Sequence, residues 1–358
     1  MPAMNIIKKL PIATIAFGLA VSLLLVKNRH QETLSSERQS EPVDMQRGRH
    51  AEVPEAIPAK GLLDVFWRLV EEVSQDRVML IAAGVTFYLL LALFPGLTAL
   101  VSIYGLIADP MTISDHLAKL SGLLPPGAFD IICEQIKSLA RRSDGTLGVT
   151  FFVGLSVALW SAHSGVLSIF DAMNVAYDEE EKRSFIRLNL IGLAFTLCFV
   201  VAAVALVALV AVLPALLSYL WLNQFQEQMA LILRWPLLLS IVIAAVMTVY
   251  RVAPSREPAH LRWLTWGAAL AICVWFVMSL AFSFYLTHFA DYNATYGTLG
   301  ALIGFLVWTW ISVAILIVGA ELNAELEHQT TRDTTTGMSR PMGSRGAYVA
   351  DTVGDAKN

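Results

Sequence analysis

Long apolar stretches separated by short polar segments make up most of this chain. Six stretches without charged residues, each close to the length of a bilayer crossing, occupy residues 79–107, 146–170, 190–222, 235–250, 263–286 and 299–320. A hydrocarbon core about 30 Å thick needs about 20 helical residues to cross it. Because lipid offers the backbone no hydrogen-bond partners, we expect these stretches to be helices. The pattern predicts an all-α, polytopic membrane helix bundle with six core transmembrane helices.

The first 60 residues differ from the rest of the chain. Residues 1–30 form a hydrophobic anchor, in which an uncharged run at 10–26 follows two lysines. A cleaved signal peptide would continue into small residues, but a basic segment at 27–30 follows instead. We therefore interpret the run as an extra N-terminal span, with a signal peptide as the alternative. Residues 31–60 are polar and contain three prolines, which predicts a flexible linker.

The membrane domain is predicted to cover residues 61–328. Its first segment, 62–70, carries apolar residues at helical spacing, so we expect it to lie along the membrane interface. The chain after residue 328 is rich in Thr, Gly and Ser, which predicts a disordered tail over 329–358.

Charge predicts the orientation of the bundle. Lys and Arg gather beside the loops of one side, at 60–77, 182–187 and 251–262. Basic loops stay in the cytoplasm, so this side and the C-terminus are expected there.

The overall composition excludes several classes of protein. Hydrophobic residues make up 56% of the chain and charged residues 15%, against about 25% charged in average proteins. A net charge of −4 argues against a nucleic-acid-binding surface. The three cysteines, Cys133, Cys198 and Cys273, form no close pair, so neither a disulfide framework nor a zinc site is indicated.

The first and third stretches contain candidate packing and kink residues. Segment 82–88 includes Gly84, a small residue that would let helices approach closely, and ends at Tyr88, a candidate for a polar path. Pro95 frees a backbone carbonyl and predicts a kink. Pro214 is expected to break the third stretch, which would be about 50 Å long if wholly helical.

The second stretch contains the most polar intramembrane cluster, around Trp160 and His163. An ionisable residue within a span is a functional candidate by default. Since the ordinary pKa of histidine is about 6.5, His163 could relay protons. The alternative is a neutral, hydrogen-bonding residue near the end of the span.

The sixth stretch combines glycines with acidic residues. Gly300 and Gly304 form a GxxxG pattern, which predicts a flat packing face, and Tyr296 precedes it as a polar-path candidate. Glu321 and Glu325 follow one turn apart at its end. They are interpreted as a solvated helix end, or alternatively as partners of arginines in the neighbouring loops.

The fourth stretch ends at Tyr250 and Arg251, on the same side as Glu321. An arginine and a carboxylate in this partly dry zone would form a charge-assisted pair. We therefore predict that Arg251 and Glu321 close a gate on a polar path that also includes Tyr250.

Four ordered motifs resemble the YihY/BrkB family of bacterial inner-membrane proteins, historically labelled ribonuclease BN. The resemblance covers roughly residues 61–328. The motifs are Ala82-Ala83-Gly84-Val85-Thr86-Phe87-Tyr88 with Ala92-Leu93-Phe94-Pro95, Leu159-Trp160-Ser161-Ala162 with Asp171-Ala172-Met173-Asn174, Val249-Tyr250-Arg251-Val252-Ala253-Pro254, and Ala294-Thr295-Tyr296-Gly297-Thr298-Leu299-Gly300-Ala301 with Gly319-Ala320-Glu321-Leu322-Asn323-Ala324.

This resemblance implies six core helices, a multi-pass location in the bacterial inner membrane and a cytoplasmic C-terminus. It is also associated with transport, including that of lipid-related cargo, so we expect a transporter or flippase whose substrate is not specified. A non-transporting envelope scaffold or assembly factor is the alternative. The lipid bilayer is the expected partner, with a homo-oligomer left open and no nucleic acid or cofactor expected.

The ribonuclease label finds little support in the residues. Phosphodiester hydrolysis usually employs clustered carboxylates or histidines that hold metal ions. Here the seven histidines are scattered, and the one acidic run, Asp178–Glu181, has no histidine beside it. We therefore expect no enzymatic activity and assign no catalytic or metal-binding residue.

Overall fold

The structure of the protein is a computed structural model, and it describes residues 47–107, 144–207, 224–288 and 300–357. A short 3-10 helix and eight α-helices account for most of these residues. They are η3 (Pro54–Ala56), α2 (Ala59–Gln75), α3 (Val78–Ile107), α6 (Asp144–Ala176), α7 (Phe185–Val207), α9 (Gln224–Val252), α10 (Leu261–His288), α12 (Gly300–His328) and α13 (Tyr348–Asp351).

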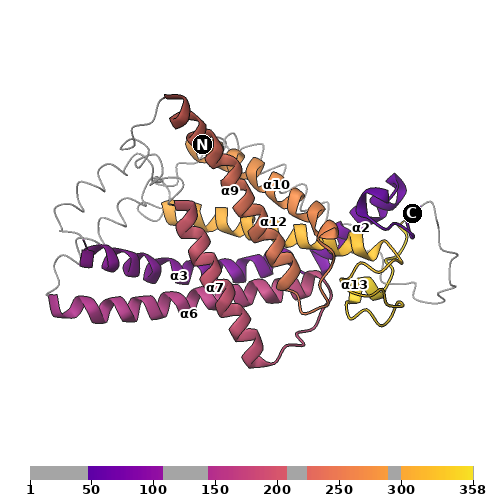
Figure 1. Ribbon diagram of the computed structural model, residues 1–358, viewed down its shortest axis with the longest axis horizontal. Helices are drawn as coiled ribbons and strands as arrows, with labels where there is room; N and C mark the ends of the chain where they lie inside the picture. Colours follow the sequence, from indigo (N-terminus) through magenta and orange to yellow (C-terminus); the bar gives the residue numbers. More distant parts are fainter. Residues whose placement is uncertain (1–46, 108–143, 208–223, 289–299, 358) are drawn as a thin grey trace, which may run out of the picture.

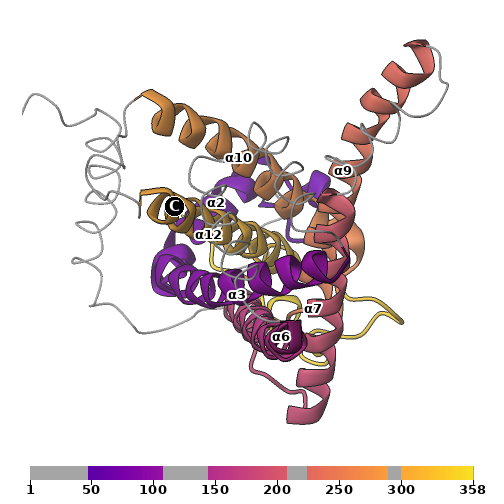
Figure 2. The same ribbon diagram turned by 90° about the vertical axis from the view of Figure 1, so that its left-hand side faces the viewer.

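Six long helices form the predicted membrane bundle. Helices α3, α6 and α12 run along the long axis of the molecule, whereas α7 and α9 cross them obliquely (Figure 1). After a quarter turn, α9 is seen to extend away from the other helices (Figure 2). Within the described residues, five helices are each long and apolar enough to cross a membrane, and α3 reaches this standard together with α2, which it meets at 57°. The all-α polytopic fold is thus confirmed, while the extra span at 10–26 lies outside the described residues.

The helices share one polar end. Helices α3, α7 and α10 begin there, and α6, α9 and α12 finish there, so the two ends of the membrane domain lie on the same side. We use "polar end" for the part of the molecule formed by α2, the loops at 177–184 and 253–260, and residues 329–357.

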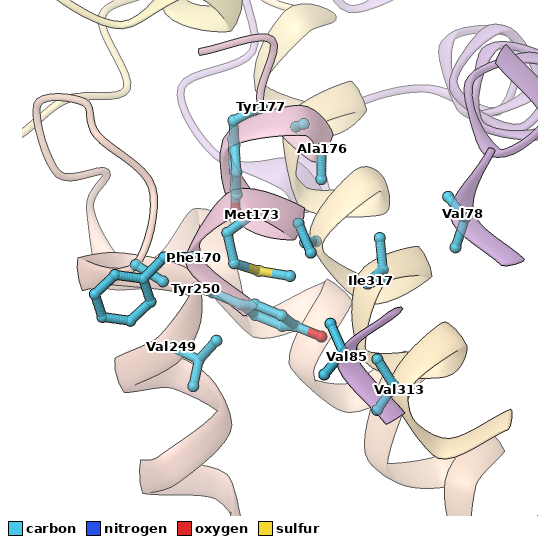
Figure 3. Packing of buried hydrophobic residues seen from close by; sticks show 14 of the residues in the cluster. Val78, Val85, Phe170, Met173, Ala176, Tyr177, Val249, Tyr250, Val313 and Ile317 are labelled. Carbon is cyan, nitrogen blue, oxygen red and sulfur yellow. The ribbon is translucent and has the colours of Figure 1, made fainter. Parts of the chain in front are cut away.

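Aromatic and apolar side chains hold the bundle together near this polar end. Tyr177, Tyr250, Phe170, Met173 and Ile317 are among its largest fully buried side chains. Tyr250 extends from α9 past Met173 of α6 toward Ile317 of α12 (Figure 3). Its hydroxyl donates a hydrogen bond of 2.8 Å to the carbonyl of Leu316. The core therefore joins three helices that are far apart in the sequence.

The close-packed glycine face differs from the predicted one. A Cβ on Gly304 would meet only Leu286, at 3.9 Å, which is ordinary van der Waals contact, and Gly84 faces open space. By contrast, Gly267 of α10 and Gly319 of α12 lie against each other so closely that neither has room for a Cβ. The packing predictions for Gly84 and Gly304 were wrong because Gly84 is exposed and Gly304, although buried beside α10, leaves room for a methyl group. Gly300 is buried at the start of α12.

The proline predictions have different outcomes. Helix α3 continues through Pro95 as one element, and the bend lies at the two-residue turn before Val78. There Arg77 adopts a left-handed backbone conformation with φ of 52°. Pro214 lies outside the described residues, and Pro236, which the sequence reasoning missed, lies inside α9.

Helix α2 is amphipathic in an unusual sense. Its buried side includes the charged residues Asp64 and Arg68, whereas its exposed side is apolar. The apolar residues are Leu62, Leu63, Phe66 and Trp67. A helix that faces the protein with charges and its surroundings with apolar rings suits the membrane interface.

Residues 329–357 are packed against the other parts of the polar end, which corrects the prediction of a disordered tail. Arg345 is buried and donates hydrogen bonds to the carbonyls of Thr331 and Arg332 at 2.8 and 3.1 Å. The amide of Thr331 donates to the carbonyl of Arg49 at 2.8 Å. Thr and Gly therefore serve here as hydrogen-bonded turn residues, and the part of the predicted linker from residue 47 onward is ordered with them.

Candidate functional site

Three acidic side chains at the end of α12 are buried. The exposed fractions of Glu321, Glu325 and Glu327 are 2%, 4% and 0%. Glu321 and Glu325 lie four positions apart and share one side of the helix, whereas Glu327 points to the opposite side. The interpretation of Glu321 and Glu325 as a solvated helix end was therefore wrong, because α2 and residues 329–357 cover this part of α12.

Two of these acids have arginine partners. The guanidinium of Arg68, on α2, is hydrogen-bonded to the carboxylate of Glu325, and its NH2 also donates to the Glu325 carbonyl at 3.1 Å. Arg256, in the loop after α9, lies 2.6 Å from the carboxylate of Glu327. Thr334 donates a further hydrogen bond of 2.7 Å to the same carboxylate. Pairing with neighbouring arginines was the alternative interpretation of Glu321 and Glu325. It holds for Glu325, although its partner Arg68 lies on α2 and not in a loop.

Glu321 faces carboxyl groups instead of an arginine. The carboxyl group of Asp76, in the turn between α2 and α3, lies close enough to act on it electrostatically. Glu72, one helical turn earlier, is also close enough to act on Glu321 electrostatically. The Oε1 atom of Glu321 is buried without a hydrogen-bond partner. Among the described residues, no basic side chain forms an ion pair with it.

The predicted gate between Arg251 and Glu321 is absent. Arg251 is half-buried in the last turn of α9, and no ion pair joins it to any acid in the described parts of the chain. The arginine that reaches α12 from this region is Arg256, and its partner is Glu327. The prediction was right that an arginine near the end of α9 pairs with an acid of α12, but it named the wrong two residues. The loop after α9 extends to Arg256 before an arginine reaches α12.

Two neutral residues continue the polar region beside Glu321. The hydroxyl of Tyr177 and the side-chain nitrogen of Asn323 are buried without a hydrogen-bond partner, although Asn323 Oδ1 accepts a 2.8 Å bond from the amide of Gly267. Burial raises the pKa of Tyr177 above its ordinary value, so its hydroxyl stays protonated. The guanidinium of Arg256 lies 4.9 Å from the centre of the Tyr177 ring. We call Tyr177, Glu321 and Asn323 the interior polar cluster.

Asp76 and Glu72 lie at the edge of this region, outside the spans. Burial raises the pKa of Asp76, with an opposing contribution from the neighbouring Glu321 carboxyl and a further raising one from Asp178. Burial and the charge of Glu325, followed by those of Asp178, Asp76 and Glu71, raise the pKa of Glu72 to about 7. A group of negative side chains without matching cations thus meets at the junction of α2, α3 and α12.

His163 lies between α6 and α7, away from α12. Its Nε2 atom is 3.0 Å from Oδ1 of Asn189, while Nδ1 is buried without a partner. The imidazole packs against Gly192 so closely that a Cβ there would overlap it. His163 is therefore a hydrogen-bonding residue of the interface between α6 and α7.

The other predicted path residues do not meet in the bundle. The side chain of Trp160 is 77% exposed and that of Tyr88 is partly exposed against Phe87, so both face outward. Tyr296 lies outside the described residues. Only Tyr250 and Glu321 lie in the interior at the polar end, and Tyr250 there bonds to the backbone of α12.

Sequence reasoning missed Asp76, Tyr177, Asn323 and Glu327. A signal was available at Glu321, Asn323, Glu325 and Glu327, because polar residues at four alternate positions fall on two opposite sides of a helix. A helix end that is polar on two opposite sides needs polar partners on both of them. In the described parts of the chain, no group of three or more His, Cys, Asp or Glu has the arrangement of a metal site.

Comparison with known proteins places the chain in a family. The sequence profile described as "Virulence factor BrkB" matches residues 69–342. The chain belongs to the BrkB virulence factor family. This agrees with the four motifs and with the membrane bundle.

Curated relatives cover most of the same region. The chain is 32% identical over 274 residues to a protein of Bacillus subtilis named as the ribonuclease-like protein YfkH, covering 74% of this chain and 94% of the relative. It is 25% identical over 274 residues to a UPF0761 membrane protein of Vibrio campbellii, covering 74% and 83%. A UPF0761 membrane protein of Chromohalobacter salexigens is 28% identical over 259 residues, covering 68% and 58%. No solved structure matches the chain.

Proposed function

We propose that this membrane protein is a transporter or flippase of the bacterial inner membrane, with the polar end and the C-terminus in the cytoplasm. The observation that carries the proposal is the interior polar cluster. Tyr177, Glu321 and Asn323 each bury a polar atom that has no hydrogen-bond partner. Such atoms are rare in folded proteins, and each one calls for an explanation.

A cost in stability supports a functional role for the cluster. A buried polar group without a partner costs about 1–3 kcal/mol. If the helix bundle had only a structural role, apolar side chains of similar size at these positions would avoid this cost. The cluster fits a protein in which a substrate group, water or a second arrangement of the helices completes these hydrogen bonds for part of a cycle.

Two other functions, a ribonuclease and a scaffold, are weighed against transport. The ribonuclease-like name belongs to the Bacillus subtilis relative, and the arginine-paired acids described above give no site of that kind. A scaffold is favoured by a separate observation, namely the ordered packing of residues 329–357 over the loops. The two candidates differ in whether the interior polar cluster ever becomes accessible to water.

Cysteine accessibility tests this difference without knowledge of the substrate. In a background with Cys133, Cys198 and Cys273 replaced by serine, an Asn323→Cys variant would be treated in native membranes with a water-soluble maleimide. A transporter exposes this position during its cycle, so we expect progressive labelling. An Ala82→Cys variant, in the apolar contact between α3 and α6, should remain unlabelled. If both positions stay unlabelled while both variants accumulate normally, the chain is a solid scaffold and the transport proposal is wrong.

A further inference from the structure

The environment of Glu321 differs from that of its two acidic neighbours on α12. Glu325 and Glu327 each have an arginine in hydrogen-bond contact. Glu321 is buried to the same degree, but it meets another carboxyl group and leaves Oε1 unpartnered. The same helix end therefore contains two compensated negative charges and one carboxyl group that lacks a cation.

A buried carboxyl group that lacks a cation favours its protonated form. The charged form loses its hydration and gains no partner in exchange. A neighbouring carboxylate adds repulsion when both groups are ionised in a poorly hydrated site. A proton held by Glu321 or Asp76 therefore removes both costs, and the protonated form also gains an O–H that can donate to the other group.

Among the described residues, the basic side chains near the pair are directed to other carboxylates. Arg68 and His328 are both directed to Glu325, and Arg256 is directed to Glu327. The titratable or charged groups nearest the pair are Glu72 from α2, Glu325 from α12 itself, and Tyr177 and Asp178 from the segment after α6.

We propose that Glu321 and Asp76 form a proton-binding site, and that its proton is the coupling ion of the transport cycle. The coupling rests on the proposed function, whereas the proton site rests on the burial of Glu321, its unpartnered Oε1 and the lack of a cation beside it. Asp76 lies in the turn where α2 and α3 meet at 57°, and Glu321 lies in α12. Loss of the proton leaves two facing carboxylates, which repel and separate α12 from this turn. Rebinding of a proton restores their contact.

Infrared spectroscopy of the purified full chain in lipid nanodiscs tests the site itself. The probe is the proton, and the signal is the C=O stretch of a protonated carboxyl group. We expect a band that persists above the pKa of Glu72, where Glu72 and the exposed carboxyls are ionised, and that is lost in Glu321→Gln. The matched control Glu72→Gln, which removes the neighbouring carboxyl, should keep the band. If wild type lacks the band, or if Glu321→Gln retains it, the proton site is wrong.

The coupling has a separate readout in the labelling of the Asn323→Cys variant. Labelling should change several-fold with pH, and adding Glu321→Gln should make it independent of pH. Labelling that occurs but is independent of pH in the presence of Glu321 overturns the coupling and leaves the proposed function standing. An infrared band without labelling at any pH overturns the proposed function and the coupling, and leaves the proton site standing.

Discussion

At the scale of single residues, surroundings decide what each acid at the polar end does. The carboxylate of Glu181, in the loop after α6, accepts bonds of 2.7 Å from both Nε and NH2 of Arg183. Although partial burial opposes ionisation, these bonds lower the pKa of Glu181 to about 2. Glu72 has acids around it, and its pKa is raised to about 7. The same side chain is therefore fully charged at neutral pH in one place and half protonated in the other.

Glu72 predicts how stability depends on pH. Its pKa in the folded state lies above the ordinary value of 4.5, so the folded state binds the extra proton between pH 4.5 and about 7. Stability is highest below this window and falls as pH rises through it. Since Glu72 is only half-buried, we expect solvent screening to limit the effect to about 1 kcal/mol. Glu72→Gln should raise the apparent Tm at pH 8 and leave it nearly unchanged at pH 4.5. A lower Tm at pH 8 would contradict this assignment.

The contact between α10 and α12 gives a second test at this scale. Gly319 has the Tyr250 hydroxyl and the Gly267 carbonyl where a Cβ would stand, so Gly319→Ala forces the helices apart. Overpacking of this kind costs about 1–3 kcal/mol. Gly304→Ala on the same helix has room for its methyl group and is the control. Detergent-solubilised protein should show a lower Tm for the first variant only, and equal Tm values would refute the tight contact.

At the scale of elements, residues 329–357 act as a structural part of the bundle. They contact the segment at 47–57, the loop at 177–184 and the loop at 253–260. The amide of Tyr348 donates to Glu179 at 2.7 Å, and that of Thr336 donates to the carbonyl of Pro258 at 2.8 Å. One segment thus ties together loops that follow different spans.

Arg345 is the residue whose loss should release this segment. Its guanidinium donates to four backbone carbonyls, those of Thr331, Arg332, Arg340 and Ala350, so Arg345→Ala leaves them without these partners. Limited proteolysis of the purified protein should cut residues 329–357 at least several-fold faster in this variant. The control is Arg340→Ala, because Arg340 is exposed and its side chain is 3.9 Å from Glu257. Equal cleavage of both variants would mean that Arg345 does not hold the segment.

The elements also show how far the sequence leads. Six uncharged stretches predicted α3, α6, α7, α9, α10 and α12 because hydrocarbon imposes a long, local pattern on the chain. The order of residues 329–357 was not predictable from composition, since its polar groups are satisfied by loops that are distant in the sequence. For the same reason Glu321 was recognised as a candidate while its partner Asp76 was missed. Arg251 was chosen as the partner only because it lies at the same depth in the membrane as Glu321, and depth alone does not determine which side chains meet.

At the scale of the whole molecule, the polar end is expected to face the cytoplasm. A reporter that is active only in the periplasm should stay silent when it is fused after Asn358. This position is preferable to one directly after His328, since an insertion there would displace residues 329–357. Strong periplasmic activity would reverse the orientation and place the proposed proton site on the periplasmic side.

The central claim is that the three acids of α12 have different roles, with Glu325 and Glu327 paired as charges and Glu321 held beside Asp76 with a proton. The most direct test is the apparent Tm of three glutamine variants in the same detergent at neutral pH. Glutamine resembles a protonated glutamate, so Glu321→Gln should keep or raise the Tm. Glu325→Gln and Glu327→Gln strand Arg68 and Arg256, at a cost of about 3–5 kcal/mol, and should lower the Tm by at least about 5 °C. An equal loss in all three variants would contradict the account.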